Sequence, residues 1–230
     1  MTESELRAKV VAQARAWLGR CEADGTHKEI IDIYNSIRPL PVGYTMRYTD
    51  AWCAATVSAI GQACGITDVL LPECSCFRMI SLYQAAGRWV ENDAYVPAPG
   101  DLIMYGWEDS GKGDYTGAPD HVGMVESCDG KTITVIEGNY SDAVKRRTIA
   151  VNARYIRGFC LPDYAGKAAQ GPEPIFSDIP AGAWYEDDVR WCVERGIFAG
   201  FEDGTFHPEA PLTRAQAAAL FRRMAQHLGA

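Results

Sequence analysis

One cysteine of the chain lies where a thiol would lose its proton easily. Cys53 belongs to the stretch TDAWCAATVSAI (residues 49–60), which has the pattern of a helix start, and Asp50 is the expected N-cap residue. Cys53 would then be the third helical residue, where unpaired backbone N–H groups and the positive end of the helix dipole stabilise a thiolate. A carboxylate of Asp50 aimed at the sulfur would oppose this effect. A buried structural cysteine is the alternative, and position alone does not decide between the two.

A nucleophilic cysteine needs a base, and the chain has four histidines. His121 starts the expected strand HVGMVES, which an Asp-Gly turn at 129–130 joins to the next strand, KTITVIEGN. A two-residue loop there places His121 opposite Gly138. A slip of one residue either way places it opposite Glu137 or Asn139. A carboxylate or an amide in that place would fix the tautomer of the imidazole and stabilise its charged form.

The elements that must position these residues are helices first and strands afterwards. Apolar residues recur at helical spacing in four stretches, 4–19, 28–37, 50–65 and 75–87. Ser75 is the expected N-cap of the fourth, and Gly65 and Gly87 are expected to end the third and the fourth.

Short β-branched or alternating segments follow, at 99–107, 121–127, 131–139, 146–152 and 156–162, and predict an antiparallel meander. In the segment 131–139, Glu137 alternates with Ile133 and Val135, so its carboxylate is expected on the apolar face. Helices followed by strands predict an α+β domain over residues 1–163.

A second, smaller module is expected after a linker. Residues 164–174 are small, polar and proline-bearing, as linkers are. Residues 175–230 predict a small helical module, in which Gly196 ends one helix and EDGT forms a turn. Thr213 and Gln216 have the spacing of a capping box, which predicts the start of the last helix.

Composition excludes several classes of function. The net charge of −8 is spread along the chain, so no basic face is expected for nucleic acid or for an anionic membrane. No apolar run is long enough to span a membrane, and the N-terminal residues lack the pattern of a secretory signal peptide. If the protein acts outside a cell, synthesis in the cytoplasm and release by another protein are therefore expected.

The eight cysteines contain no C-x-x-C pair, so reduced thiols are expected rather than disulfides or a metal site. The segment FEDGTFHPEAPL lacks the alternating oxygen ligands of a calcium loop. No metal and no cofactor are predicted.

Four motifs in order, TDAWCA, PAPGDLIMY, HVGMVES and IEGNYS, resemble the CHAP domains, which are cysteine- and histidine-dependent amidohydrolases/peptidases with a papain-like fold. The resemblance implies Cys53 as nucleophile, His121 as base, Glu137 as the residue that orients the base, and Asn139 as a further polar group. It also implies peptidoglycan as substrate, cut at an amide bond in or next to the stem peptide. The segment 107–120 is less typical of the family and bears on the shape of the groove.

The C-terminal module resembles one S-layer homology (SLH) repeat, most specifically in DGTFHP and LTRAQ. Such repeats bind secondary wall polymers, which are commonly anionic. Arg214, at a helix start that favours anions, is the candidate contact, and a solvated surface charge is the alternative. A single repeat should bind weakly unless chains associate, so a homo-oligomer is one route to avidity.

Three residues beside the cysteine are candidates for supporting roles. Tyr48 could donate to an oxyanion or be a phenol with another partner, Asp50 lies at the expected helix start, and Trp52 fits a pocket wall or the core better than a sugar platform. The leading hypothesis is a phage-endolysin-like wall hydrolase. The alternatives are a non-catalytic wall-binding protein and a cytosolic papain-like peptidase or transglutaminase, which leaves the C-terminal module unexplained.

Overall fold

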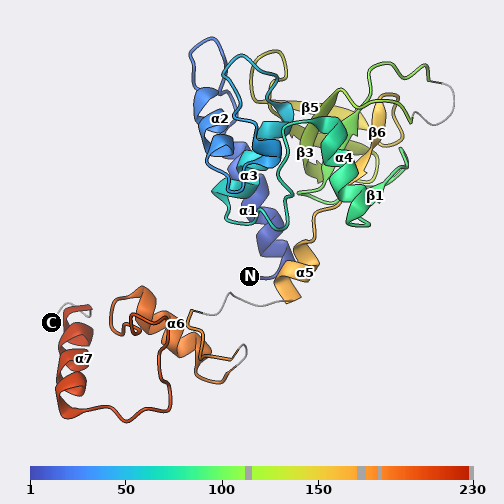
Figure 1. The fold of residues 1–230 in the computed structure, drawn as a ribbon. Helices are drawn as coiled ribbons and strands as arrows, with labels where there is room; N and C mark the ends of the chain where they lie inside the picture. The colour runs from blue at the N-terminus through green and yellow to red at the C-terminus, as the bar shows by residue number, and fades with distance from the viewer. Residues whose placement is uncertain (112–115, 170–174, 181–182, 228–230) are drawn as a thin grey trace. The chain divides into compact units, whose positions relative to one another are not determined.

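The structure is a computed structural model that describes residues 1–111, 116–169, 175–180 and 183–227 (Figure 1). The chain forms two compact units, residues 2–167 and 168–230, with Met1 grouped with the second. Residues 112–115 of the unusual segment and 170–174 of the expected linker lie outside the described residues. The first part of that expected linker is not extended, because Tyr164–Ala169 form the short helix α5.

The first unit has the expected α+β architecture, and its four longer helices begin and end close to the predicted residues. They are α1 (Glu3–Ala16), α2 (Lys28–Asn35), α3 (Cys53–Ala63) and α4 (Cys76–Ala85), and a 3₁₀ turn covers Pro41–Gly43. Ser75 caps α4 by accepting from the N–H of Arg78, and Gly65 and Gly87 follow α3 and α4 with φ of +67° and +66°. Helices α1 to α3 gather on one side of the sheet (Figure 1).

The start of α3 differs from the expectation. Asp50 is not its cap: the helix begins at Cys53 after Trp52, and no side chain caps it. The Asp50 carboxylate instead closes a preceding turn, where it accepts from the backbone N–H of Arg47 at 2.8 Å and from the hydroxyl of Tyr44 at 2.8 Å. Cys53 is therefore the first helical residue rather than the third, and the carboxylate is occupied away from it.

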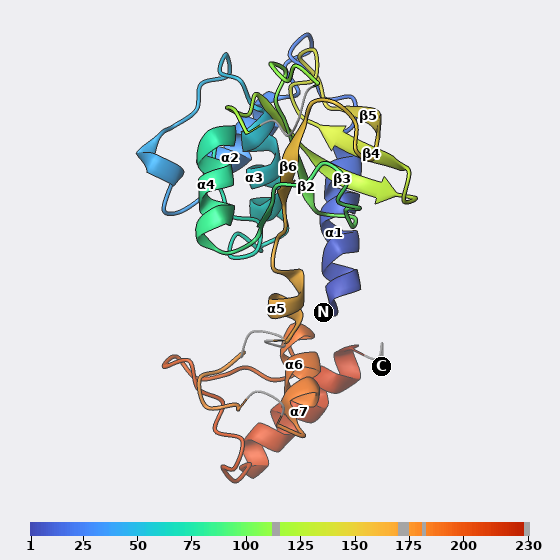
Figure 2. The same cartoon turned by 90° about the vertical axis from the view of Figure 1, so that its right-hand side faces the viewer.

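Six strands form one antiparallel sheet in the order β1-β6-β2-β3-β4-β5. They are β1 (Trp89–Val90), β2 (Leu102–Tyr105), β3 (His121–Cys128), β4 (Thr132–Glu137), β5 (Lys145–Ala150) and β6 (Ile156–Cys160). Figure 2 shows β6 running beside β2 near the middle of the sheet.

The meander prediction holds for β2 to β5 and is wrong for β6, which returns to pair with β2 and with the unpredicted strand β1. Every residue of β6 is buried, whereas β5 exposes alternate residues. A fully buried strand needs neighbours on both sides, so β6 takes an interior place and β5 forms an edge.

The register of β3 and β4 also differs from that expected. Cys128 pairs with Ile133, so the connection is longer than two residues, and the register shifts again at Glu126, the extra residue of a bulge. The register beyond the bulge differs by one residue from that of a two-residue loop. This is one of the two one-residue slips that the sequence left open. In this register Gly138 is not directly opposite His121, and Glu137 on β4 lies diagonally across from His121 on β3.

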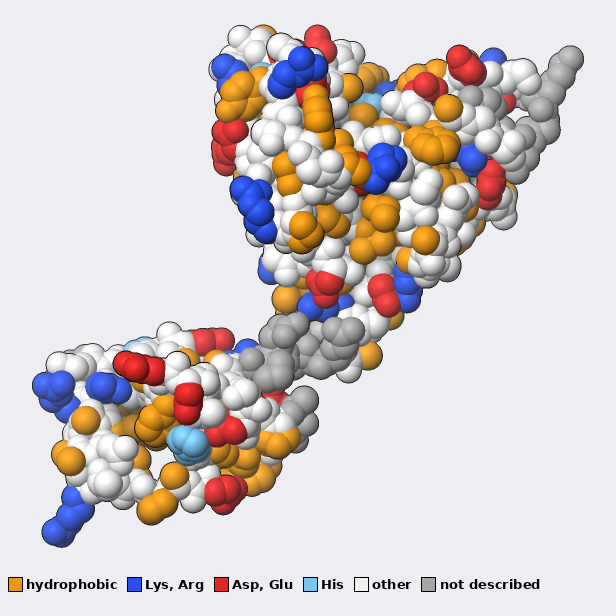
Figure 3. Space-filling model, viewed as in Figure 1, with side chains coloured by type: hydrophobic (Ala, Val, Ile, Leu, Met, Phe, Trp, Pro, Cys, Tyr) orange, Lys and Arg blue, Asp and Glu red, His pale blue; other side chains and the backbone are white. Residues whose placement is uncertain are grey.

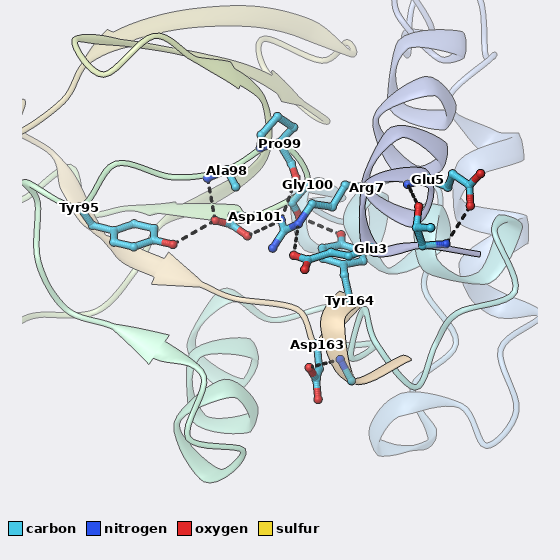
Figure 4. Close-up of polar contacts among 12 residues, drawn as sticks. Glu3, Glu5, Arg7, Tyr95, Ala98, Pro99, Gly100, Asp101, Asp163 and Tyr164 are labelled. Atoms are coloured by element: carbon cyan, nitrogen blue, oxygen red, sulfur yellow. Dashed lines mark hydrogen bonds and ion pairs between the residues drawn. The ribbon is translucent and has the colours of Figure 1, made fainter. Parts of the chain in front are cut away.

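A polar network fixes the loop before β2 to both ends of this unit (Figure 4). The guanidinium of Arg7 on α1 donates to Asp101 Oδ1 at 3.0 Å and to the Pro99 carbonyl at 2.9 Å. The same guanidinium lies 4.6 Å from the ring centre of Tyr164, whose hydroxyl donates to the Gly100 carbonyl. Gly100 has φ of +88°, and a Cβ there would lie 3.0 Å from that hydroxyl, so glycine is required at this position.

The second unit contains α6 (Glu186–Glu194) and α7 (Arg214–His227). The predicted stop at Gly196 is present with φ of +65°, and the turn at 201–205 is closed by the Phe201 N–H and the Thr205 carbonyl. The capping box is confirmed, because Thr213 and Gln216 exchange hydrogen bonds at 2.9 and 3.2 Å. Figure 3 shows many apolar side chains at the surface of this unit, in agreement with the absence of buried residues in α7.

Candidate active site

Three elements bring a thiol, an imidazole and a carboxylate together. Cys53 is the first residue of α3, His121 the first of β3 and Glu137 the last of β4. His121 Nε2 lies 3.1 Å from Glu137 Oε2, and the imidazole is close enough to the Cys53 thiol for each group to shift the pKa of the other. Because Nε2 is paired with the carboxylate, Nδ1 is the ring nitrogen that can exchange a proton with the Cys53 sulfur. All three side chains are buried, and Cys53 is 7% and His121 9% exposed.

The thiol and the imidazole shift each other toward an ion pair. Hydrogen bonding from Cys76 and from His121, with the charge of His121, holds the pKa of Cys53 well below its usual range despite burial. Burial alone would lower the pKa of His121, but the hydrogen bonds and charges of Cys53 and Glu137 raise it to about 9. The backbone N–H of Ala54, at the start of α3, also lowers the pKa of Cys53.

Glu137 is held as a buried carboxylate by a set of donors. Its exposed fraction is 0%, and burial opposes ionisation, yet hydrogen bonds from His121, Arg147 and Tyr105 keep its pKa below the usual value. Tyr105 donates to Oε1 at 2.7 Å, and Arg147 donates to Oε1 at 2.7 Å and to Oε2 at 3.0 Å. Such a fully paired carboxylate can fix the ring of His121 without taking its proton.

The side chain of Glu137 reaches His121 across a glycine. A Cβ at Gly123 would collide with Val135 Cγ1 and lie 2.7 Å from Glu137 Cγ. Only glycine therefore leaves room on β3 for the carboxylate to approach the imidazole. The same contacts place Glu137 on the face of Val135, as the alternation of β4 predicted.

Three neighbours of the triad were missed by the sequence analysis. Tyr105 lies opposite His121 on β2, and Arg147 lies opposite Val135 on β5. Cys76, the first residue of α4, places its sulfur 3.7 Å from that of Cys53. Strand alternation indicates which face Tyr105 and Arg147 occupy, but their contact with Glu137 depends on the strand order. No sequence pattern pointed to Cys76, whose neighbour in the structure is 23 residues away.

Of the supporting residues named from the sequence, Asn139, Tyr48 and Trp52 form no side-chain hydrogen bonds to the triad among the described residues, and two of them have other partners. Asn139 is half-buried in a left-handed backbone conformation with φ of 56°, and within the described residues its side chain makes no hydrogen bond to the triad. Tyr48 is largely exposed, and its hydroxyl donates to Asp32 at 2.7 Å. Trp52 is fully buried, and its indole N–H donates to Glu22 at 2.9 Å, as expected for a core residue.

Trp107 provides an aromatic surface beside the triad. It is 41% exposed, stacks on Tyr105 with ring centres 5.1 Å apart, and lies 6.1 Å from the ring centre of His121.

In the second unit, Arg214 is exposed at the first position of α7. Across the described residues, no group of His, Cys, Asp and Glu side chains has an arrangement that could hold a metal ion, and none of the helices has the length and apolarity to cross a membrane.

Family comparisons match these two units separately. One family model, the CHAP domain, matches residues 43–139, and a second, the S-layer homology domain, matches residues 175–218. The chain contains a CHAP domain and an SLH domain. Cys53, His121, Glu137 and Asn139 all fall within the CHAP match, and Arg214 falls within the SLH match.

Individual relatives cover short parts of the chain. It is 32% identical over 81 residues to the outer membrane protein SlpA of Deinococcus radiodurans, a match that covers 35% of this chain and 7% of the relative. It is 47% identical over 53 residues to SlpA of Thermus thermophilus, which covers 23% and 6%, and 41% identical over 49 residues to an S-layer protein of Bacillus licheniformis, which covers 21% and 6%. The chain thus matches less than a tenth of the length of each of these relatives.

The crystal structure of Ly7917 is a similar solved structure at 18% identity, covering 68% of this chain and 62% of that one, with a TM-score of 0.34. A likeness of this size carries no argument about the fold.

Proposed function

We propose that this protein is a peptidoglycan hydrolase that cuts an amide bond in or next to the stem peptide with Cys53 as nucleophile, as endolysin-like amidases and endopeptidases do. The observation that carries the proposal is the buried Cys53–His121–Glu137 arrangement within the CHAP domain. A papain-like arrangement of the first unit is part of the same proposal, and so are the domain bounds 1–163 and 175–230.

The geometry supports a two-step reaction. The Cys53 thiolate attacks the carbonyl carbon, and unpaired backbone N–H groups at the start of α3 can donate to the oxyanion that forms. The His121 imidazolium then protonates the leaving amine, which yields a thioester on Cys53. Neutral His121 next takes a proton from water, the hydroxide attacks the thioester, and the carboxylic acid product leaves with the thiol restored. Glu137 keeps the ring in one orientation and stabilises its charged form through both steps.

Mass spectrometry of fragments from purified peptidoglycan tests this proposal. An amidase would release whole stem peptides with a free amino group on their first residue, whereas an endopeptidase would create a new amino terminus inside the peptide. Intact walls after prolonged incubation would contradict hydrolysis and would favour the second candidate, a non-catalytic wall-binding protein whose CHAP domain holds peptide. The paired Cys53, His121 and Glu137 side chains favour the enzyme over that candidate.

The pH dependence of kcat/KM should report the ion pair. The active form needs Cys53 deprotonated and His121 protonated, so activity should rise as pH passes the lowered pKa of Cys53 and fall as pH passes about 9, the raised pKa of His121. The two midpoints belong to the coupled pair rather than to either residue alone. A profile that rises only in the ordinary thiol range, near pH 8.5, would contradict a preformed thiolate.

The same shift has a consequence for stability. Because the folded-state pKa of His121 lies above its unfolded value, its stabilising contribution is complete below the unfolded pKa and is lost as pH rises through about 9.

The SLH domain indicates association with the cell wall or cell surface, and we place Arg214 at its contact with an anionic wall polymer. Arg214→Ala should reduce the fraction of protein that sediments with purified walls, and added salt should weaken wild-type binding in the same way. The chain carries −8 overall, so attachment to a polyanion has to be local. Arg222→Ala, an exposed arginine further along α7, is the matched control. If neither Arg214→Ala nor added salt changes the fraction that sediments with walls, the domain would instead serve packing or homo-oligomer formation.

A further inference from the structure

Two thiols meet inside the candidate active site. Cys53 and Cys76 are the first residues of α3 and α4, and their sulfurs lie 3.7 Å apart. Both side chains are buried, at 7% and 9% exposure. All eight cysteines are free and lie within the described residues, and this is the one pair among them with sulfurs in hydrogen-bond contact. A disulfide would require the sulfurs to approach by about 1.7 Å, to the bond length of about 2.05 Å.

The roles of the two sulfurs are unequal. Cys53 has the thiolate character of a nucleophile, since Cys76, His121 and the Ala54 N–H all stabilise its charge. The neighbouring negative sulfur and burial hold the pKa of Cys76 well above its usual range, so Cys76 stays protonated. One thiol is therefore ready to react with an oxidant, and the other is a second thiol held against it.

We propose that Cys53 and Cys76 form a reversible oxidation site, in which a hydroperoxide oxidises Cys53 and Cys76 captures the product as an intramolecular disulfide. The proposal rests on the proposed function only in using the same activated thiolate. It assigns Cys76 a role that the hydrolytic reaction does not need.

The steps balance with one peroxide and one proton. The Cys53 thiolate attacks the O–O bond, which breaks to give a sulfenic acid and an alkoxide or hydroxide, and the His121 imidazolium protonates that leaving group. Cys76 sulfur then attacks the sulfenic sulfur, the S–O bond breaks, and the hydroxyl leaves with the Cys76 proton as water. The two sulfurs lose two electrons in total, and the peroxide gains them.

The first step removes the obstacle to the second. While Cys53 is a thiolate, its charge disfavours ionisation of Cys76. Conversion to a neutral sulfenic acid removes that charge, and His121, once it has given up its proton, can accept the proton of Cys76 and pass it to the departing hydroxyl. The disulfide removes the nucleophile from the active site and shields Cys53 from further oxidation to sulfinic and sulfonic acids, which thiols do not reverse.

The test treats the full-length protein with hydrogen peroxide, blocks remaining thiols by alkylation, and measures the mass of the intact protein and of its peptides. Wild type should carry alkyl groups on six of its eight cysteines and lose two hydrogen atoms at the other two, with the bond mapped between the Cys53 and Cys76 peptides. Dithiothreitol added to a portion that was oxidised but not alkylated should restore both the mass and the starting wall-clearing activity. Cys76→Ala should instead gain two or three oxygen atoms on Cys53, with little recovery of its own starting activity.

Cys74→Ala is the matched control, because Cys74 lies two residues from Cys76 but directs its sulfur at Glu73, and it should behave as wild type. A wild-type disulfide to any other cysteine, or direct accumulation of sulfinic acid on Cys53, would overturn the proposal. The mapped bond is read from wild type, so a misfolded variant cannot obscure it. The mass measurement does not depend on activity. If untreated protein cleared no walls, hydrolysis would be refuted, but the mass would still show whether the disulfide forms.

Discussion

Cys53→Ser is expected to lower wall-clearing activity by more than about 10³-fold while the protein stays folded. Sulfur and oxygen differ little in volume, so the fold should survive. A serine hydroxyl does not ionise near neutral pH, so the surroundings that lower the pKa of the Cys53 thiol would not produce an anionic nucleophile in the variant. Turbidity of a peptidoglycan suspension measures the effect, and thermal unfolding checks that the fold survives.

Cys128→Ser is a suitable control for loss of a thiol as such. Cys128 ends β3 next to the hairpin turn, where its sulfur accepts from the N–H of Gly130 at 3.4 Å, away from the triad. Its serine variant should clear walls at the wild-type rate. Clearing by Cys53→Ser at a rate close to wild type would remove Cys53 from the nucleophile role.

His121→Ala is expected to cost about as much as Cys53→Ser, and the double variant should be no worse than either single one, because the two groups act as a unit. Loss of the imidazolium also removes a hydrogen bond and a charge that favour the thiolate, so the pKa of Cys53 should rise. Ultraviolet titration of the thiolate measures this rise independently of activity.

His27→Ala separates this effect from general loss of a histidine. His27 is buried, with its ring nitrogens 3.2 and 3.0 Å from the carbonyl oxygens of Cys21 and Tyr48, so its replacement should lower thermal stability rather than remove the reaction. Inactivation by His27→Ala together with full activity of His121→Ala would contradict the assignment of the base.

Local patterns predicted the elements of this protein well. Capping residues and apolar spacing gave four helices and the SLH helix start, and alternation placed Glu137 on the correct face of β4. Asp50 was assigned wrongly because an aspartate three residues before a helix satisfies a turn as readily as a cap. Both uses have the same local sequence, and only the contacts with Tyr44 and Arg47 distinguish them.

Contacts between distant segments could not be predicted in the same way. The place of β6 depends on which strand pairs with a fully buried neighbour. The bulge lies at Glu126, whose side chain forms ion pairs with Arg15 and Arg146 from two other elements, α1 and β5. The partners of Glu137 and the meeting of Cys53 with Cys76 follow from that strand order and from the packing of α3 and α4. The sequence can therefore name the candidate reacting groups but not the residues that shift their pKa values.

The Arg7 network has a consequence for synthesis of the chain. Arg7 on the first helix contacts Asp101 before β2 and Tyr164 at the end of the first unit. Contacts between residues so far apart in sequence form late, because the intervening chain must first be ordered. Helix α1 leaves the ribosome before the rest of this unit, but its packing is complete only after the final residues of the unit have been added. The nascent chain should therefore assemble the candidate active site around Cys53 only near the end of that unit's translation.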